Sequence, residues 1–494
     1  MKRALTFMLA VALMSSCVAC GGEIKGEISS QPDDTTTAPL EKGYDYAAVN
    51  VEPGSYRILS MQDDYSMHMK FDVAEANGES LNDAIYNRNR YVEDKLGIQI
   101  EEILVDLGNF SQNSTGIADM IRKNVEAGDD FCDMTQIPPS NCASMFFDGY
   151  FLNLLDYDGF QLDEAWYNQI YNDAVTLKGN LFFGMSSATV GLTDGMWAHF
   201  FNEDMMEKHK LEKPYQLVRD GKWTIDKFNE YLAVVTNLNG DSSYTWNKNG
   251  NSVYGGTGGY NVFRMMNGMG EVLVDYVDGE LSFAAGGERF YQVTDILAKM
   301  ANLSDGLLYN HGPGTGGELD AETGGYIYPW TVQRSLFQAA EVCKTTLFRN
   351  LDFTYGVVPY PKLDTTQERY ITAMFQEAAA FAIPVTAKNP ERSAVIWDAL
   401  AYEGMMQVQD IYREYTLEQK GLRNEESIEM LGIIMNSPYV DFGSMFGLTP
   451  YAMIKNFFNE ITAGGGALAS LIETNRTSIE GKLKELNDKL AALK

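Results

Sequence analysis

The chain has 494 residues, of which 68 are Asp or Glu and 38 are Lys or Arg, and its formal net charge is -30. Affinity for nucleic acid comes from Lys and Arg that neutralise phosphates, so this charge excludes nucleic acid as a partner and also excludes adsorption of the whole surface onto anionic lipid. The length corresponds to about three ordinary domains or two large ones.

The N-terminus has the layout of an export signal. Met1-Lys2-Arg3 is basic, the stretch from Ala4 to Met14 is apolar, and small residues follow. The apolar stretch is shorter than the ~20 residues that a spanning helix needs, which favours a cleavable signal over an uncleaved membrane anchor.

A cysteine lies where the signal would be cleaved. This pattern resembles the bacterial lipoprotein signal, in which that cysteine receives lipid and becomes the mature N-terminus. Cys20 follows the small residues Val18-Ala19 and is the predicted lipidation site, with Cys17 as the alternative. The sequence therefore places the protein on the extracellular face of the cell membrane, where its only contact with the membrane is an N-terminal lipid.

Residues 21–52 are rich in Gly, Ser, Thr, Asp and Pro, and this composition predicts a flexible tether. The body that follows alternates between short apolar segments and amphipathic ones. The predicted strands are Tyr56 to Met61, Ile98 to Val105 and Phe131 to Ile137, and the predicted helices between them are Leu81 to Lys95 and Ile117 to Glu126. This order is typical of a parallel sheet covered by helices.

The second half of the chain predicts a hairpin and further helices. Asp278-Gly279 is a hairpin turn between the strands Val272 to Val277 and Glu280 to Phe283. The predicted helices are Phe290 to Leu303, Pro390 to Tyr402 and Thr474 to Leu493. The last helix has one apolar stripe, and packing against its own domain is favoured over a coiled coil because the stripe is only two heptads long.

Motifs for catalysis are missing. The sequence has 4 histidines without zinc-ligand spacing, no phosphate-binding loop and no nucleophile elbow. The run Gly255 to Gly259 is predicted to be a loop. Acidic pairs such as Asp63-Asp64 and Asp129-Asp130 are expected by chance in so acidic a chain. We therefore predict a protein that is not an enzyme and that needs no cofactor or metal.

Only a few cysteines follow the signal, too few for a disulfide scaffold. Cys132 and Cys142 are close enough in sequence to pair, but pairing depends on backbone geometry that the sequence does not show, and it is the less favoured alternative.

Four sequence segments together resemble those of a known family. They are Leu81 to Ile98, Phe200 to Met205, Asp220 to Phe228 and Tyr355 to Lys362. In this order they resemble extracellular solute-binding proteins of family 1, the lipoprotein receptors of ATP-driven sugar importers in Gram-positive bacteria. The resemblance runs from about Tyr56 to the C-terminus.

The resemblance implies an α/β fold of the two-lobed, periplasmic-binding-protein-like type II, with a ligand cleft between the lobes. Lobe 1 would comprise residues 53–195 and 375–420, and lobe 2 would comprise residues 196–374 and 421–494. Each lobe would then carry its own sheet, and the chain would cross between the lobes more than once.

Ligands of open parallel sheets lie beyond the carboxyl ends of the strands, and the segments that cross between lobes line the cleft. These two rules, applied to the resemblance, select polar and aromatic residues that suit the hydroxyls and ring faces of a sugar. The predicted ligand contacts are Asp63, Asp64, Tyr65, Ser140, Asn141, Asp194, Trp197, Tyr260, Trp330, Gln376, Glu377, Tyr439 and Asp441. Trp197 is the strongest of them, and core packing remains the alternative for every aromatic residue.

The implied function is capture of a carbohydrate, in particular an oligosaccharide, and its delivery to the permease subunits of an ABC transporter. A glycan-binding surface protein without a transport role, a receptor for peptides or another small polar solute, and a surface enzyme acting on polysaccharide are the alternatives.

Overall fold

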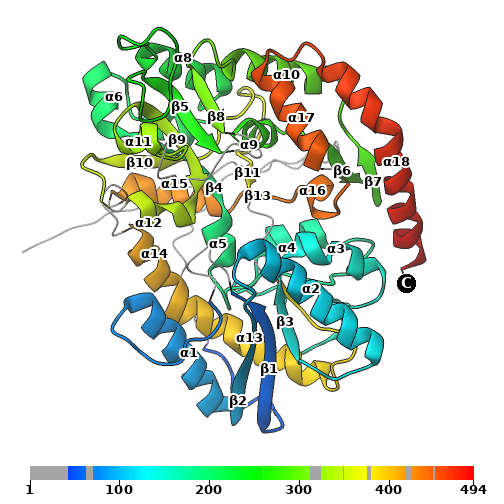
Figure 1. Ribbon diagram of the computed structural model, residues 1–494. Coiled ribbons are helices and arrows are strands. Elements are labelled where there is room, and N and C mark those ends of the chain that lie inside the picture. The colour runs from blue at the N-terminus through cyan, green and yellow to red at the C-terminus, as the bar shows by residue number, and fades with distance from the viewer. Residues whose placement is uncertain are drawn as a thin grey trace, which may run out of the picture. The chain divides into compact units, whose positions relative to one another are not determined.

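The computed structural model describes residues 43–62, 70–259, 261–311, 324–348, 350–374, 380–417, 422, 424–448 and 451–493 (Figure 1). The predicted signal, Cys17, Cys20 and nearly all of the tether lie outside these residues. From Tyr44 onward the chain forms one compact unit. None of the helices within the described ranges combines the length and the apolar character that crossing a bilayer requires.

The first sheet is built mainly from the N-terminal part of the chain. Its strands are β1 (Gly54–Met61), β2 (Ile98–Val105), β3 (Met134–Ile137) and β12 (Ala380–Ala382), in the order β12-β3-β1-β2. β1 is parallel to both β2 and β3, whereas β12 is antiparallel to β3. The predicted parallel sheet is therefore confirmed, and we call this sheet with its helices the first lobe.

Helices connect and cover these strands. They are α1 (Ser80–Leu96), α2 (Phe110–Ala127), α3 (Pro139–Phe147) and α13 (Pro390–Gly404). α2 lies in front of the sheet and α13 passes behind it (Figure 1), where α13 packs against α1. Both faces of the sheet are thus buried, as a parallel sheet requires.

Local signals set the ends of these helices. The Glu79 carboxylate accepts hydrogen bonds from the first backbone N–H groups of α1, and Gly97 ends that helix in the left-handed conformation, with φ 68°. Asn109 caps α2 in the same way by accepting from the N–H of Gln112. This cap explains why α2 begins at Phe110, earlier than the apolar pattern from Ile117 predicts.

The second sheet forms the core of the second lobe. Its strands are β4 (Trp197–Asn202), β5 (Tyr254–Gly259), β8 (Leu308–His311), β9 (Ser335–Glu341) and β10 (Tyr355–Val358), in the order β10-β4-β9-β5-β8. β4 is antiparallel to both of its neighbours, and β5 is parallel to both of its own. The accompanying helices are α6 (Glu203–His209), α7 (Tyr215–Arg219), α8 (Ile225–Val235), α9 (Asn261–Gly268), α10 (Glu288–Met300), α11 (Tyr328–Thr331), α12 (Thr345–Phe348) and α15 (Glu425–Met435).

The glycine run Gly255 to Gly259 is not the loop that the sequence predicts, because it belongs to β5. A Cβ atom at Gly255 would lie 2.5 Å from the Cβ of Leu232 on α8, and one at Gly258 would lie 2.6 Å from the Cβ of Ala339 on β9. Glycine is therefore required by close packing of α8 and β9 against this strand. The prediction was wrong because it counted the glycines as turn formers.

Segments that pass between the two sheets pair with one another. β11 (Thr372–Ala373) is parallel to β13 (Pro438–Tyr439), and Met374 forms a β-bridge with Met196 just before β4. The Thr372 hydroxyl lies 2.8 Å from the Ser437 hydroxyl, and the Thr372 N–H donates to the Ser437 carbonyl. Segments distant in sequence are thus held together where the chain passes from one sheet to the other.

The hairpin prediction is confirmed by β6 (Val274–Val277) and β7 (Glu280–Phe283), which are antiparallel. Asp278 and Gly279 both have positive φ, 52° and 82°, as a tight two-residue hairpin turn demands. The C-terminal helices α16 (Phe442–Met445), α17 (Tyr451–Thr462) and α18 (Leu468–Ala492) follow.

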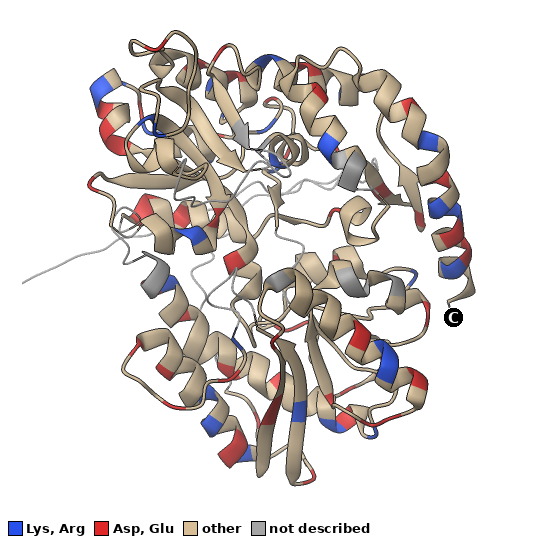
Figure 2. Ribbon diagram, viewed as in Figure 1, with Lys and Arg blue, Asp and Glu red and all other residues tan. Residues whose placement is uncertain are grey.

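α18 packs against α17 and β7, so the prediction that it lies against its own domain is confirmed. Ile479, Leu483 and Leu490 of the predicted stripe are buried. Acidic and basic residues alternate along the rest of the helix (Figure 2), and Lys484 pairs with Asp488 one turn on. This exposed face has the mixed charge of a solvated surface.

The remaining elements are the short helices η1 (Leu154–Asp156), α4 (Gln169–Val175), α5 (Gly191–Gly195) and η2 (Val342–Lys344), the π-helical turn η3 (Met405–Gln409) and α14 (Asp410–Leu417). Cys132 is a free, buried cysteine, so the alternative of a bond between Cys132 and Cys142 is not realised.

Candidate functional site

The carboxyl end of β3 presents polar atoms that lack partners. Gln136 is 3% exposed, and no hydrogen bond is made by either its side-chain oxygen or its nitrogen within the described part of the chain. The hydroxyl of Ser140, in the first turn of α3, is also buried and makes no hydrogen bond to a described residue. Burying such groups without partners costs about 1–3 kcal/mol each. A ligand that supplies hydrogen bonds would recover this cost.

Trp197 opens β4, immediately after the chain enters the second lobe. Its side chain is 3% exposed, and its indole Nε1–H has no acceptor among the residues described. The guanidinium of Arg264, on α9, lies over the indole with its Cζ 5.1 Å from the ring centroid. Trp197 therefore combines a packed ring with an unused donor.

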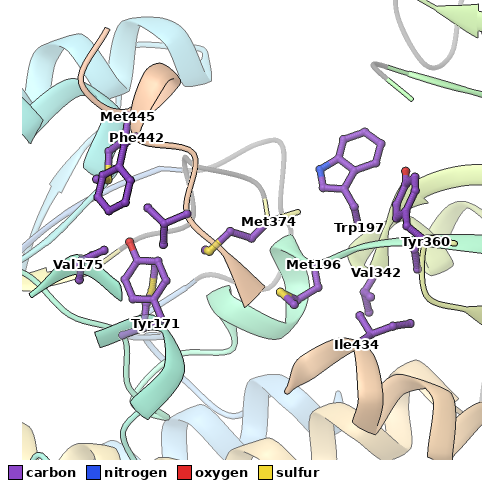
Figure 3. Packing of buried hydrophobic residues seen from close by; sticks show 14 of the residues in the cluster. Tyr171, Val175, Met196, Trp197, Val342, Tyr360, Met374, Ile434, Phe442 and Met445 are labelled. Carbon is purple, nitrogen blue, oxygen red and sulfur yellow. The ribbon is translucent and has the colours of Figure 1, made fainter. Parts of the chain in front are cut away.

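Tyr360 lies beside Trp197 (Figure 3) and follows β10 in sequence. Its ring centroid is 4.2 Å from that of His199, which shares a face of β4 with Trp197. Its buried hydroxyl has no hydrogen-bond partner in the described structure, and the same is true of the Nε of Arg264. Burial raises the pKa of Tyr360 well above its usual value, while the charge of Arg264 acts to lower it and that of Glu341 to raise it.

These three side chains form one group, which we call the Trp197 cluster: Trp197, Arg264 and Tyr360. The strand β4 holds Trp197 and the helix α9 holds Arg264, while Tyr360 lies two residues beyond the end of β10. Its donors outnumber its acceptors, because an indole N–H and a guanidinium can only donate. The cluster is suited to a ligand rich in acceptor oxygens.

Tyr439 reaches the same region from another crossing segment. It pairs with Ala373 across β13 and β11, next to the bridge between Met374 and Met196. Burial raises the pKa of its hydroxyl well above the usual value, and nearby Asp441 adds to the shift. This hydroxyl also makes no hydrogen bond to any described residue.

Other predicted contacts have structural partners. Asp194, in α5, is fully buried and accepts a hydrogen bond from the Tyr412 hydroxyl of α14. Asp441 caps α16 by accepting from the backbone N–H of Gly443 and from the Ser444 hydroxyl. Both carboxylates tie crossing segments to neighbouring helices.

Trp330 lies in the core of the second lobe, and its indole Nε1–H, like that of Trp197, has no acceptor among the residues described. It is 0% exposed, and its ring packs edge-on against Phe348, Phe353 and Tyr355. This is the core-packing alternative that the sequence left open.

The remaining predicted contacts are beyond what the structure describes. Asp63, Asp64, Tyr65, Tyr260, Gln376 and Glu377 lie outside the described residues, and of Asn141 only the backbone, in α3, is described.

A pocket of about 300 Å³ borders the carboxyl ends of β1 and β2, where the sequence argument expected a ligand. Gln62, Asp72 and Glu102 are among its lining residues. Burial raises the pKa of Glu102, although a hydrogen bond from the Ser60 hydroxyl, 2.6 Å away, opposes the shift. A larger hollow of about 440 Å³, between Ile103 and Met120, is lined by none of the predicted contacts.

Sequence reasoning missed Gln136, Arg264 and Tyr360. Gln136 is an amide side chain within a short strand that is buried throughout, which is a signal that could have been used, and Tyr360 lies within a segment that carries the resemblance. Arg264 has no local signal, because its importance comes from contact with a residue far away in sequence. Among the described residues, no group of His, Cys, Asp or Glu is arranged to hold a metal ion.

Comparison with known proteins identifies the fold. No protein-family model matches the sequence, and no curated protein matches it either. Solved structures do match. An ABC substrate-binding protein from Listeria monocytogenes in complex with cycloalternan is 10% identical, with a TM-score of 0.55 over 88% of this chain and 100% of that one.

Two further structures resemble the chain to the same degree. A cyclo/maltodextrin-binding protein complexed with maltotetraose is 13% identical, with a TM-score of 0.56 over 86% of this chain and 97% of that chain. UgpB from Mycobacterium tuberculosis in complex with glycerophosphocholine is 12% identical, with a TM-score of 0.56 over 88% and 99%. The chain thus has the two-lobed α/β fold of periplasmic-binding-protein type II, as predicted.

Proposed function

We propose that the protein is an extracellular, non-catalytic receptor that captures a carbohydrate, in particular an oligosaccharide, between its two lobes and delivers it to an ABC importer. The observation that carries the proposal is the concentration of unpartnered polar atoms around aromatic rings where the chain passes between the sheets. Sugars need both features, since their hydroxyls require hydrogen bonds and their ring faces pack on aromatic planes. The similar structures from Listeria and of the cyclo/maltodextrin-binding protein hold oligosaccharides, which supports this class of ligand.

We assign the contacts to the two lobes as follows. Trp197 stacks on a sugar ring, with Arg264 and Tyr360 beside it, and Gln136 and Ser140 hydrogen-bond from the first lobe. Tyr439 contributes from the crossing segment. We also retain Asp63, Asp64, Tyr65, Asn141, Tyr260, Gln376 and Glu377 as proposed contacts, whereas Asp194 and Asp441 position the segments that carry them.

Access to this site requires motion, because Trp197 and Tyr360 are 3% and 0% exposed. Hinge rotation of two lobes about their connecting segments is an established way to open such a site. The lobe limits that we propose are residues 53–195 with 375–420, and 196–374 with 421–494. The paired segments β11 and β13 would form part of the hinge.

The N-terminal sequence supplies the proposed location. Lipid on Cys20 and a tether over residues 21–52 would hold the receptor at the extracellular face of the membrane, next to the permease subunits that accept its ligand. Growth of cells on labelled palmitate would test the lipid: wild type should incorporate it and Cys20→Ala should not, while incorporation lost only in Cys17→Ala would move the site.

The test of ligand class is a thermal-shift screen of the full chain with neutral and charged oligosaccharides, peptides and small organic acids. A ligand that binds only the folded state raises the melting temperature. We expect oligosaccharides to stabilise the protein and to be recovered unchanged. Stabilisation by peptides alone would contradict the carbohydrate assignment, and turnover of a labelled oligosaccharide would contradict the non-catalytic one.

A further inference from the structure

The Trp197 cluster holds a positive charge in a strongly negative protein. The chain carries a formal net charge of -30, yet Arg264 lies half-buried over the Trp197 ring and makes no use of its Nε–H within the described structure. A guanidinium that stacks on an aromatic ring keeps its edge free to donate, in a fork that matches the oxygens of a carboxylate or phosphate.

The neighbouring groups reinforce this preference for an anion. The indole Nε1–H of Trp197 and the Nε–H of Arg264 can only donate, and the Tyr360 hydroxyl is a further buried donor. A neutral sugar hydroxyl offers one acceptor oxygen and one proton that needs an acceptor of its own. A carboxylate or phosphate ester offers only acceptor oxygens, so it can satisfy several neighbouring donors without leaving a proton unpaired.

Glu341 is an acidic residue beside the Trp197 cluster. It pairs in register with Trp197 across β9 and β4, and its charge acts on Tyr360 in the opposite sense to that of Arg264. An anionic ligand beside Trp197 would lie near the charges of both residues, and of these two only Arg264 can favour its binding. The site would be selective for ligands that reach the guanidinium edge.

We propose that the ligand is an acidic carbohydrate whose anionic oxygen group, a uronic-acid carboxylate or a sugar phosphate, is held by Arg264 and the Trp197 indole N–H. This inference rests on the proposed function, since it specifies the class of carbohydrate at the same site. Neutral rings of the same ligand would occupy the hydrogen-bonding groups of the first lobe.

The experiment uses matched pairs of probes that differ only in charge. Isothermal titration of the full chain compares an α-1,4-linked galacturonate trimer with its carboxyl-reduced counterpart, and a maltotriose carrying one phosphate ester with maltotriose. We expect the acidic member of at least one pair to bind tenfold or more tightly than the neutral one, with an affinity that falls as salt is raised. A difference within the galacturonate pair would identify a carboxylate as the recognised group, and a difference within the maltotriose pair would identify a phosphate.

Variants then assign the effect to Arg264. Arg264→Gln should abolish the difference within the pair, and Arg264→Lys should retain part of it because the charge remains. Arg219→Gln is the matched control, since Arg219 pairs with Glu429 on α15 and lies outside the cluster. Circular dichroism melts of each variant show whether it is folded.

The outcomes separate this inference from the proposed function. Equal affinity for acidic and neutral sugars, or an acidic preference unchanged in folded Arg264→Gln, would overturn the inference and leave carbohydrate capture standing. Binding of peptides with no carbohydrate binding in either pair would overturn both.

Discussion

The two lobes present different chemistry to the space where we place the ligand. Among the residues that the structure describes, the first lobe offers Gln136 and Ser140, which are neutral and can both donate and accept hydrogen bonds. The second lobe offers an indole, a guanidinium and a phenol. Among these described groups, those of the first lobe suit sugar hydroxyls, whereas those of the second lobe offer an aromatic ring and a positive charge, so substitutions at them should have distinct consequences.

The largest effect is expected at Trp197. Trp197→Ala should lower the free energy of unfolding by about 3–5 kcal/mol, because it empties a buried aromatic site. Trp197→Phe retains a ring beneath Arg264 but loses the N–H, so it should fold well and bind ligand about tenfold more weakly, which corresponds to one hydrogen bond. Urea denaturation and isothermal titration on both variants measure the two quantities.

Trp330→Phe is the control for this prediction. Trp330 packs in the aromatic core of the same lobe, so its replacement should cost stability and leave affinity unchanged. If Trp197→Phe behaves like Trp330→Phe, Trp197 is a packing residue and the second lobe loses its proposed stacking group.

The next largest effect is expected at Gln136 in the first lobe, where a substitution should raise the free energy of unfolding instead of lowering it. Gln136→Leu removes two buried polar atoms that lack partners, so the unliganded protein should gain about 1–3 kcal/mol while its affinity for ligand falls. The free energy of unfolding, measured by denaturation without ligand, should therefore rise, and the affinity, measured by titration with ligand, should fall.

Thr135→Val tests the specificity of that result. The Thr135 hydroxyl donates to the Ala382 carbonyl at 2.9 Å, so its loss should destabilise the protein by about 1 kcal/mol. A loss of stability in Gln136→Leu comparable to that in Thr135→Val would show that Gln136 is satisfied in solution and is not held ready for ligand.

The link between the lobes should show a smaller effect. Thr372→Val and Ser437→Ala each break the hydrogen bond between their hydroxyls, and a double-mutant cycle should give a coupling of about 0.5–1.5 kcal/mol. Additive effects of the two substitutions would mean that these crossing segments are not held together by this contact.

The smallest effect is a pH dependence confined to the first lobe. Burial raises the pKa of Glu102, so the folded protein binds this proton more readily than the unfolded chain does. The ionised carboxylate therefore costs stability above the raised pKa, and this cost disappears as the pH falls through it. Glu102→Gln, which can still accept from Ser60, should be more stable than wild type near neutral pH, and the advantage should shrink in mildly acidic buffer.

Denaturation midpoints of both proteins across that pH range measure the difference. If the midpoints of wild type and Glu102→Gln differ by the same amount at every pH, ionisation of Glu102 is not the source of the stability difference.

The sequence predicted the three parallel strands of the first sheet because their signals are local. Alternating apolar residues mark β2, and residues next to α1 and α2 cap them, so each element can be recognised without its neighbours. β5 could not be recognised in this way, because its glycines are explained only by the approach of Leu232 and Ala339. The candidate site shows the same contrast between residues that have a local sequence signal and residues that have none.

Trp197 was predicted because it lies at a crossing point, which the order of elements indicates. Arg264 and Gln136 were not, since their significance depends on partners that they have or lack in three dimensions. Trp330 illustrates the converse, because a tryptophan in the expected lobe turned out to lie in the core. Residue type alone does not separate a ligand contact from a core residue.

The glycine strand also has a consequence for how the second lobe is assembled. Glycine loses more backbone entropy on ordering than any other residue, and β5 has few side chains with which to offset that loss. Its strand conformation must therefore depend on α8 and β9 being in place against it. In hydrogen-exchange experiments we expect the amides of Gly256 and Gly258 to exchange together with those of β9, as one cooperative unit, and not through local opening of their own.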